Sequence, residues 1–353
     1  MSDQSGGGKV SRAFFEERIA PNLGAERSDV ALGPAHGCDF GVIRPNGSPH
    51  ATVLATDPIS ILPDLGLDRA GRFALHVVLS DVAVSGVAPS HLSIAFSLPE
   101  SMIDDEFGAV WKAVHEECER LGIAVTTGHT ARYPGATLPW VGAATAIGVG
   151  DPDRIVRPDG ARVGDRIVVT KGPAVESVGL FASLFPEAID LPAETVATAQ
   201  ELLDDVRLVA DALAVAEAAR GAVGDGNAGV HAMHDATEGG LLGAFHEMAA
   251  AAGVRFAVET DAVPWQPGVS AVCDALGMDP WRATTAGTLL ASVAPEAADA
   301  VVEALRDRDT PAAVVGEVQE GEGVTLDGTE TDAPTGDASW PIYADLSARE
   351  TTD

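Results

Sequence analysis

Three observations predict a mixed α/β (α+β) fold with two domains. The chain has 353 residues, which exceeds the size at which a single hydrophobic core usually keeps growing. Hydrophobic residues make up 46% of it and are spread evenly, which is enough for two buried cores. Segments with helix and strand periodicity alternate through the N-terminal half, as is typical of α/β architecture.

The N-terminal half contains the clearest elements. Apolar periodicity predicts a short helix over 13–20, a helix over 69–84 and an amphipathic helix over 104–121 that Gly122 ends. Apolar runs predict strands over 39–43, 51–56, 91–98, 123–127 and 141–149.

The loop-rich segment 150–165 predicts a domain boundary. Beyond it we expect strands over 166–170, 286–293, 312–318 and 323–326, with helices over 194–220, 239–252 and near 295–307. The last thirty or so residues, acidic and turn-rich, predict a loose tail. The predicted organisation is therefore an N-terminal extension and helix (1–30), two domains (31–155 and 156–320) and an acidic tail (321–353).

The charge of the chain is its most extreme property. The net charge is −31, and lysine occurs only at positions 9, 112 and 171. An acidic, lysine-poor composition is typical of a cytoplasmic protein from a salt-in halophile, where salt screens the self-repulsion. The acids are scattered, which disfavours an acidic partner-binding surface, and the lack of a basic patch disfavours nucleic acid as a partner.

Cysteine usage and hydropathy place further bounds on the class of protein. Cys38, Cys118 and Cys273 are an odd number at irregular spacing, so they predict neither a disulfide framework nor a zinc-ligand pair. The polar residues 1–9 contain no apolar signal core, and no later run approaches the length of a membrane span. We expect a soluble cytoplasmic protein without a membrane partner.

Three aspartates in the N-terminal half follow or interrupt apolar runs. They are Asp39 in Gly37-Cys38-Asp39, Asp57 after Thr56, and Asp81 after Ser80. Asp57 alone also fits a strand-ending turn, and Asp81 alone also fits a solvent-facing position on its helix. Mg²⁺ prefers oxygen ligands and is usually held by one or two carboxylates together with substrate phosphates. The set therefore indicates a site for Mg²⁺ and phosphate.

A fourth segment, Gly128-His129-Thr130, is expected to form a turn after a strand. His129 and Arg132 there either contact a phosphate or have a purely structural role, and the residues alone leave both open.

The segment around residues 231–247 has two further interpretations. His231 and His234, with Glu238, His246 and Glu247 downstream, suggest zinc, although no H-E-x-x-H is present. Asp235 and Glu238 instead fit a capping box at the start of a helix. The glycine pair at 239 and 240 would let a phosphate approach the free amides of that helix.

In this order the motifs resemble the superfamily of aminoimidazole ribonucleotide (AIR) synthetase, the hydrogenase-maturation carbamoyl dehydratase, thiamine-phosphate kinase and selenophosphate synthetase. The resemblance extends over about residues 30 to 320, and SDVAVSGVAP (80–89) and HDATEGG (234–240) carry it most specifically. It implies two α/β domains, a homodimer whose N-terminal domains share a β-barrel, and ATP with Mg²⁺ in the cleft between the domains.

The resemblance also implies roles for individual residues. It makes His129, Lys171 and Asp235 the catalytic candidates, with His129, Thr130 and Lys171 in contact with phosphates. It makes Asp39, Asp57 and Asp81 the metal ligands. The residues implied to line the nucleotide and substrate are Gly37, Asp39, Asp57, Asp81, Gly128, Thr130, Gly172, Thr237, Gly239 and Gly240.

The chain departs from the superfamily at informative positions. Cys38 and His129 stand where many members have an aspartate, and the surroundings of Cys38 do not match the catalytic cysteine of a selenophosphate synthetase. The sequence ends at Asp353 without the terminal cysteine that accepts the carbamoyl group in the hydrogenase-maturation enzyme. We therefore expect an ATP-dependent enzyme that passes the γ-phosphate to, or activates, an oxygen of an unidentified small substrate. The alternative is a nucleotide-binding accessory or sensor protein without turnover.

Overall fold

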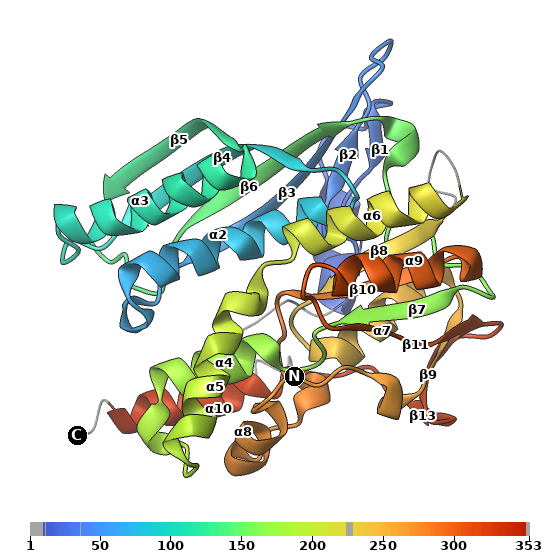
Figure 1. The fold of residues 1–353 in the computed structure, drawn as a ribbon. Helices are drawn as coiled ribbons and strands as arrows, with labels where there is room; N and C mark the ends of the chain where they lie inside the picture. The colour runs from blue at the N-terminus through green and yellow to red at the C-terminus, as the bar shows by residue number, and fades with distance from the viewer. Residues whose placement is uncertain (1–9, 11, 36, 224–228, 351–353) are drawn as a thin grey trace.

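Two β-sheets and the helices around them make up the protein (Figure 1). The computed structural model describes residues 10, 12–35, 37–223 and 229–350. The ends of the predicted extension and tail, residues 1–9, 11 and 351–353, lie outside this range. Within the described residues no helix is both long and apolar enough to cross a membrane.

The N-terminal sheet has the strand order β1-β2-β3-β6-β4-β5, antiparallel except for the parallel pair β4–β5. Helices α2 (Leu67–Ala83) and α3 (Asp104–Leu121) pack together over one face. The strands are β1 (Val30–Leu32), β2 (Gly41–Ile43), β3 (Ala51–Ser60), β4 (Pro89–Leu98), β5 (Ala124–Arg132) and β6 (Trp140–Gly150). Alternate residues of β4 are buried under the helices. Because successive side chains of a strand point to opposite faces, this alternation identifies the face of the sheet that the helices cover.

The C-terminal sheet has the order β13-β12-β9-β11-β7-β10-β8, which makes β8 an edge strand. Helices α6 (Val209–Val223) and α9 (Pro295–Arg306) cover one face, and the strongly apolar α7 (Gly240–Ala252) covers the other. The strands are β7 (Arg166–Thr170), β8 (Val230–Ala236), β9 (Arg255–Val258), β10 (Thr288–Val293), β11 (Ala312–Gln319), β12 (Gly323–Leu326) and β13 (Thr329–Thr331).

A third layer of helices has its own apolar core. It consists of α4 (Val175–Leu184), α5 (Ala193–Glu201), α8 (Val269–Leu276) and α10 (Ser339–Glu350). At the other end of the chain, α1 (Arg12–Phe14) continues through a π-helical turn (Phe15–Ile19) and a 3₁₀ turn (Ala20–Asn22), in agreement with the short helix predicted over 13–20.

One hydrophobic core joins the two halves of the chain. It runs from β3 and α2 of the N-terminal sheet to α6 and β10 of the C-terminal sheet, and includes Val53, Leu79, Val215 and Leu289. Helix α2 also contacts β8 directly. The end of α2 that carries Asp81 is therefore held beside the edge of the second sheet.

The predicted α/β class is confirmed, but three local predictions are wrong and one strand was not predicted. The single helix expected over 194–220 is two helices, because residues 202–206 turn inward and bury Leu203 and Val206 against Phe73 of α2. Residues 128–130 continue strand β5 rather than forming a turn. The segment 230–236 is a strand, and the tail is not loose, because α10 docks through the buried Leu346.

We expect Phe96→Ala to lower the free energy of unfolding by about 3–5 kcal/mol. Phe96 is 1% exposed and packs edge-on against Phe107 at a centroid distance of 5.2 Å, so truncation leaves a cavity beneath α3. The exposed Phe14 provides the matched control, for which we expect a change below about 1 kcal/mol. Denaturant titration measures both, and equal losses would contradict the assignment of this core.

Candidate functional site

Four carboxylates from distant parts of the chain meet where α2 and β3 approach the edge strand β8. Asp81 lies near the end of α2, Asp57 lies in β3, Asp39 follows the loop before β2, and Asp235 is in β8. The negative charges of the other three all act on Asp81. We call Asp39, Asp57, Asp81 and Asp235 the carboxylate cluster.

His234 is the only cationic group found within the cluster among the described residues. Its Nδ1 contacts Asp39 Oδ2 at 2.5 Å, and its Nε2 contacts Glu247 Oε2 of α7 at 2.8 Å. Burial alone would lower the pKa of His234, but the two carboxylates outweigh it and hold the pKa well above the ordinary value. The imidazolium thereby fixes the position of Asp39 against the edge of β8.

Asp81 is held in its neutral form by its surroundings, whereas His234 is held in its charged form. Burial, followed by repulsion from the neighbouring carboxylates, raises the pKa of Asp81 well above its usual value. A hydrogen bond that the protonated Asp81 carboxyl donates to Asp57 raises it further. The four acids can all ionise together only if a cation is bound among them.

The arrangement suits a cation that prefers oxygen. One ligand atom from each of Asp39, His234 and Asp235 lies within 4.8 Å of the others, and Asp57 and Asp81 are adjacent to this group. A hard divalent cation such as Mg²⁺ would be held by the carboxylates rather than by His234, whose ring is already occupied on both nitrogens.

Cys38 does not replace the acid that many members have at its position. Its Sγ donates a hydrogen bond to the carbonyl of Phe40 at 3.4 Å. Burial and the adjacent Asp39 raise the pKa of the thiol to about 11, so it stays protonated near neutral pH. A neutral thiol neither ligates Mg²⁺ nor attacks a substrate. Gly37, with φ +74°, packs against Glu247 and holds this loop on α7.

Lys171 lies in the interior rather than beside the carboxylate cluster. Its Nζ donates to the carbonyls of Asp205, Arg207 and Gly287 at 2.7, 2.9 and 3.1 Å, and it pairs with Asp211 at 2.9 Å. These contacts use all three ammonium protons. The geometry therefore gives Lys171 a structural role and does not support the expected phosphate contact.

The β5 residues do not meet the cluster within one chain. Gly128 lies in the same cross-strand row as Asp57 but three strands away, which is about 14 Å. His129 occupies the next row, so its side chain points to the opposite face, and its Nε2 lies 3.2 Å from the Tyr133 hydroxyl. Every residue of β5 except Ala131 is exposed, Thr130 included.

The turn between β8 and α7 differs from the predicted capping box. Asp235 is part of β8, and the N-cap of α7 is Gly239 with φ +81°. The Gly239 amide donates to Asp337 Oδ2 at 2.8 Å, so a carboxylate from the C-terminal segment occupies the position that an anion would take. Gly240 is required here, because a Cβ would lie 2.6 Å from the carbonyl oxygen of Trp281.

Two other glycine-turn residues complete the predicted set. The carbonyl of Thr237 accepts the amide of Gly240 at 3.0 Å, which closes the turn. Gly172 has φ +98°, and a Cβ there would lie 1.9 Å from the carbonyl oxygen of Pro264. Gly172 therefore packs against backbone.

The histidines considered for zinc do not converge. His231 and His234 are three apart in a strand and so point to opposite faces of the sheet. His231 contacts Asp165 at 2.8 Å, and His246 of α7 contacts the Thr331 hydroxyl at 3.1 Å. The zinc interpretation is therefore wrong for this set.

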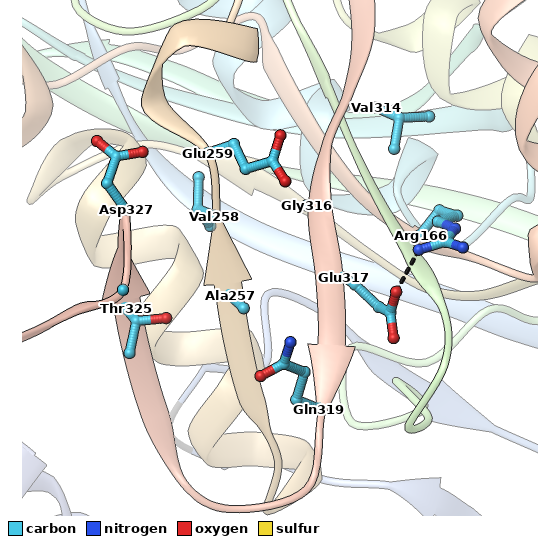
Figure 2. A pocket seen from close by; sticks show the side chains of 11 residues that line it. Arg166, Ala257, Val258, Glu259, Val314, Gly316, Glu317, Gln319, Thr325 and Asp327 are labelled. Carbon is cyan, nitrogen blue, oxygen red and sulfur yellow. Dashed lines mark hydrogen bonds and ion pairs between the residues drawn. The ribbon is translucent and has the colours of Figure 1, made fainter.

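A groove on the C-terminal sheet lies away from the carboxylate cluster. It has a volume of about 560 Å³ and is lined by residues of β7, β9, β11 and β12 (Figure 2). Arg166 and Glu317, two of its lining residues, form an ion pair. Strands β9, β11 and β12 are separated from β8 by β7 and β10, so the groove is not part of the cluster.

Comparison with known proteins places both halves of the chain in one family. Residues 37–149 match the model for the N-terminal domain of AIR synthase related proteins, and residues 162–328 match the model for the C-terminal domain. The carbamoyl dehydratase HypE of Escherichia coli K12 is 30% identical over 260 residues, which are 73% of each chain. HypE of Rhizobium leguminosarum bv. viciae is 29% identical over 70% of this chain and 67% of its own.

Solved structures share the same two-domain fold. The structure of E. coli HypE, a hydrogenase maturation protein, superposes with a TM-score of 0.69 at 29% identity, covering 82% of this chain and 88% of that one. AaThiL complexed with AMPPCP and TMP superposes with a TM-score of 0.68 at 20% identity, covering 87% and 92%. At 20% identity, the similarity to AaThiL shows a shared fold only.

We expect Lys171→Met to destabilise the protein by about 3–5 kcal/mol, because the buried Asp211 would lose its closest cation and keep only Arg308, at 3.8 Å. Lys112→Met, which removes an exposed lysine paired with Glu116, should cost less than about 1 kcal/mol. Chemical denaturation gives both values. A stable Lys171→Met protein that had lost nucleotide affinity would instead restore the phosphate-contact role.

Without divalent cations, we expect stability to fall as pH rises from about 5 to about 8. Asp81 and His234 both have folded-state pKa values above their unfolded values of about 4 and about 6.5, so the folded state holds their protons longer. Their contribution is complete below the unfolded pKa and is lost as pH rises through the folded one. Thermal unfolding in EDTA measures this, and Asp81→Asn should flatten the slope. An equal slope in that variant would refute the assignment.

Proposed function

We propose, from the premise that the chain belongs to the AIR synthase-related family, that it is an ATP-dependent enzyme acting at a Mg²⁺–ATP site. The reaction would pass the ATP γ-phosphate to an oxygen of a small substrate, either as the product or to turn that oxygen into a leaving group. The substrate itself is not specified by the fold, because one scaffold hosts many reactions.

The carboxylate cluster is the observation that carries this proposal. Four acids around one histidine would repel a triphosphate, so the nucleotide can enter only together with cations that neutralise both sides. Mg²⁺ meets this requirement, since it takes one or two carboxylates and fills its remaining positions with phosphate oxygens and water. In phosphoryl transfer, catalysis comes mainly from such positioning and charge neutralisation.

The relatives support a nucleotide as the ligand. AaThiL was solved with AMPPCP, an analogue of ATP, and its fold matches this chain over both sheets. The nucleotide would lie in the cleft between the halves, with Asp39, Asp57 and Asp81 on the N-terminal side and Asp235 on the C-terminal side.

The remaining residues near the site would position the carboxylates, face the substrate or support the fold. His234 and Glu247 would hold Asp39 and Asp235 in position, and Thr237, Gly239 and Gly240 would face the substrate beside Asp337. Lys171 would only support the fold of this region.

A homodimer would give the β5 residues a place in this scheme. The open face of the N-terminal sheet and the exposed β5 suit contact with a second copy. Gly128, His129 and Thr130, which cannot reach their own cluster, would then act toward the site of the partner subunit. We also propose a cytoplasmic location and a high-salt environment on composition alone.

A second function is favoured by Cys38. Because this thiol stays protonated, the cluster lacks one carboxylate that many members have, and the number of metal ions it holds would be smaller. A protein of this kind could bind nucleotide as a sensor or accessory without turnover. Substrate-stimulated release of ADP against a panel of small metabolites would exclude that function.

We expect Asp57→Asn to weaken Mg²⁺–ATP binding at least tenfold, about 1.4 kcal/mol, with the fold intact. Calorimetric titration with AMPPCP in high salt with Mg²⁺ measures the affinity, and circular dichroism checks the fold. The exposed Asp64→Asn, which removes the same charge outside the cluster, should bind like the wild type. Equal affinity in the Asp57 variant, or no binding by the wild type, would contradict the proposal.

A further inference from the structure

The segment that connects β13 to α10 crosses the N-terminus of α7. It comprises residues 332–338, which we call the strap. Its outer residues are exposed, namely Asp332, Ala333, Thr335 and Gly336. On its inner side, Asp337 Oδ2 accepts a hydrogen bond from the Gly239 amide at 2.8 Å, and the Ala338 amide donates to the carbonyl of Arg282 at 2.9 Å. The strap therefore lies on the turn that begins α7.

The strap supplies the N-terminal cap of α7. Gly239, the N-cap residue, has no side chain that could accept a hydrogen bond from the turn. The first amides of a helix have no partner within the helix, and together with the helix dipole they attract an anion. Here the anion is the carboxylate of Asp337, which lies 98 residues further along the chain.

Asp337 can release α7 while α10 stays in place. Its other oxygen, Oδ1, accepts from the amide and the hydroxyl of Ser339 at 2.8 and 2.5 Å, where α10 begins. Further along, α10 is anchored by the buried Leu346 and by Tyr343, whose ring packs edge-on against Phe185. Lifting the strap from Gly239 therefore breaks the Oδ2 contact without undocking the helix.

Like charges oppose the closed position of the strap. Burial raises the pKa of Glu176 at the start of α4, and the charges of Asp337 and Glu238 raise it further. Thr284 and Ala286 stabilise the Glu176 carboxylate by hydrogen bonds, so it too is held in this acidic surrounding. The closed strap thus places one more carboxylate where others already repel it.

We propose that the strap is a displaceable lid, in which Asp337 stands in for an oxyanion group of the substrate at the N-terminus of α7. The entering group would accept the hydrogen bond of the Gly239 amide, and Asp337 would move out with the strap. The role toward a substrate rests on the proposed function, which assigns this turn to the substrate. The exchange of one anion for another at Gly239 does not.

Inorganic phosphate, without nucleotide or Mg²⁺, tests this exchange on the full chain. We expect Asp337→Ala to raise the apparent phosphate affinity at least about tenfold over the wild type in calorimetric titration at constant ionic strength, because the Gly239 amide loses its carboxylate. Asp337→Asn keeps an oxygen for the amide of Ser339, which preserves the start of α10, and should change the affinity in the same direction. In crystals of either variant, phosphate should lie within hydrogen-bond distance of the Gly239 nitrogen.

A charge-matched control and a measurement on the wild type separate displacement from ordinary capping. Asp345→Ala removes the same charge from an exposed position of α10 and should bind phosphate like the wild type. In the wild type, a high phosphate concentration should speed hydrogen exchange in the strap and leave residues 342–349 unchanged. A cap that stays in place predicts no such increase.

The proposal is overturned if neither Asp337 variant gains phosphate affinity, if Asp345→Ala gains as much, if phosphate binds away from Gly239, or if exchange in the strap is unaffected by phosphate. A gain in phosphate affinity in a chain that fails to bind Mg²⁺–AMPPCP would support the lid and count against the proposed enzyme alone.

Discussion

Mutual repulsion among four buried or half-buried carboxylates is the constraint around which the rest of this structure is arranged. Asp39, Asp57, Asp81 and Asp235 come from a loop, a strand, a helix and an edge strand, and a shared hydrophobic core brings these elements together. Folding without a cation is possible because Asp81 keeps its proton and His234 carries a positive charge between Asp39 and Glu247. Without metal, protons on Asp81 and His234 thus reduce the repulsion among the carboxylates, a role that a bound metal ion would take in the active protein.

The same constraint explains the supporting features around the cluster. Lys171, buried with Asp211 and three carbonyl groups, ties β7 to the segment 205–207, which packs against α2. Gly240 lets the turn after β8 pass close to the backbone of Trp281, so that α7 can bring Glu247 to His234. These residues act on the site through position rather than through contact with a ligand.

Sequence patterns correctly predicted the helices and strands whose apolar pattern can be recognised from local spacing alone. The amphipathic helix 104–121 and the strands 166–170 and 323–326 have the predicted bounds, because their apolar faces depend on local spacing. The strand at 230–236 was missed because His234 and His231 are held by contacts with Asp39 and Asp165, which both lie far away in the sequence. Asp39, Asp57, Asp81 and Asp235 were found through motif order. Glu247 was considered only as a zinc ligand, because its contact with His234 forms only when α7 folds across β8.

The most direct test is the location of a divalent cation in crystals of the chain grown with Mn²⁺ and AMPPCP. Mn²⁺ occupies the oxygen-rich sites that Mg²⁺ prefers and is visible by its anomalous scattering. The account predicts an anomalous peak bonded to carboxylates of Asp39, Asp57 or Asp81 and to phosphate oxygens of the nucleotide. A nucleotide bound elsewhere, or Mn²⁺ absent from the four carboxylates while nucleotide is bound, would contradict it.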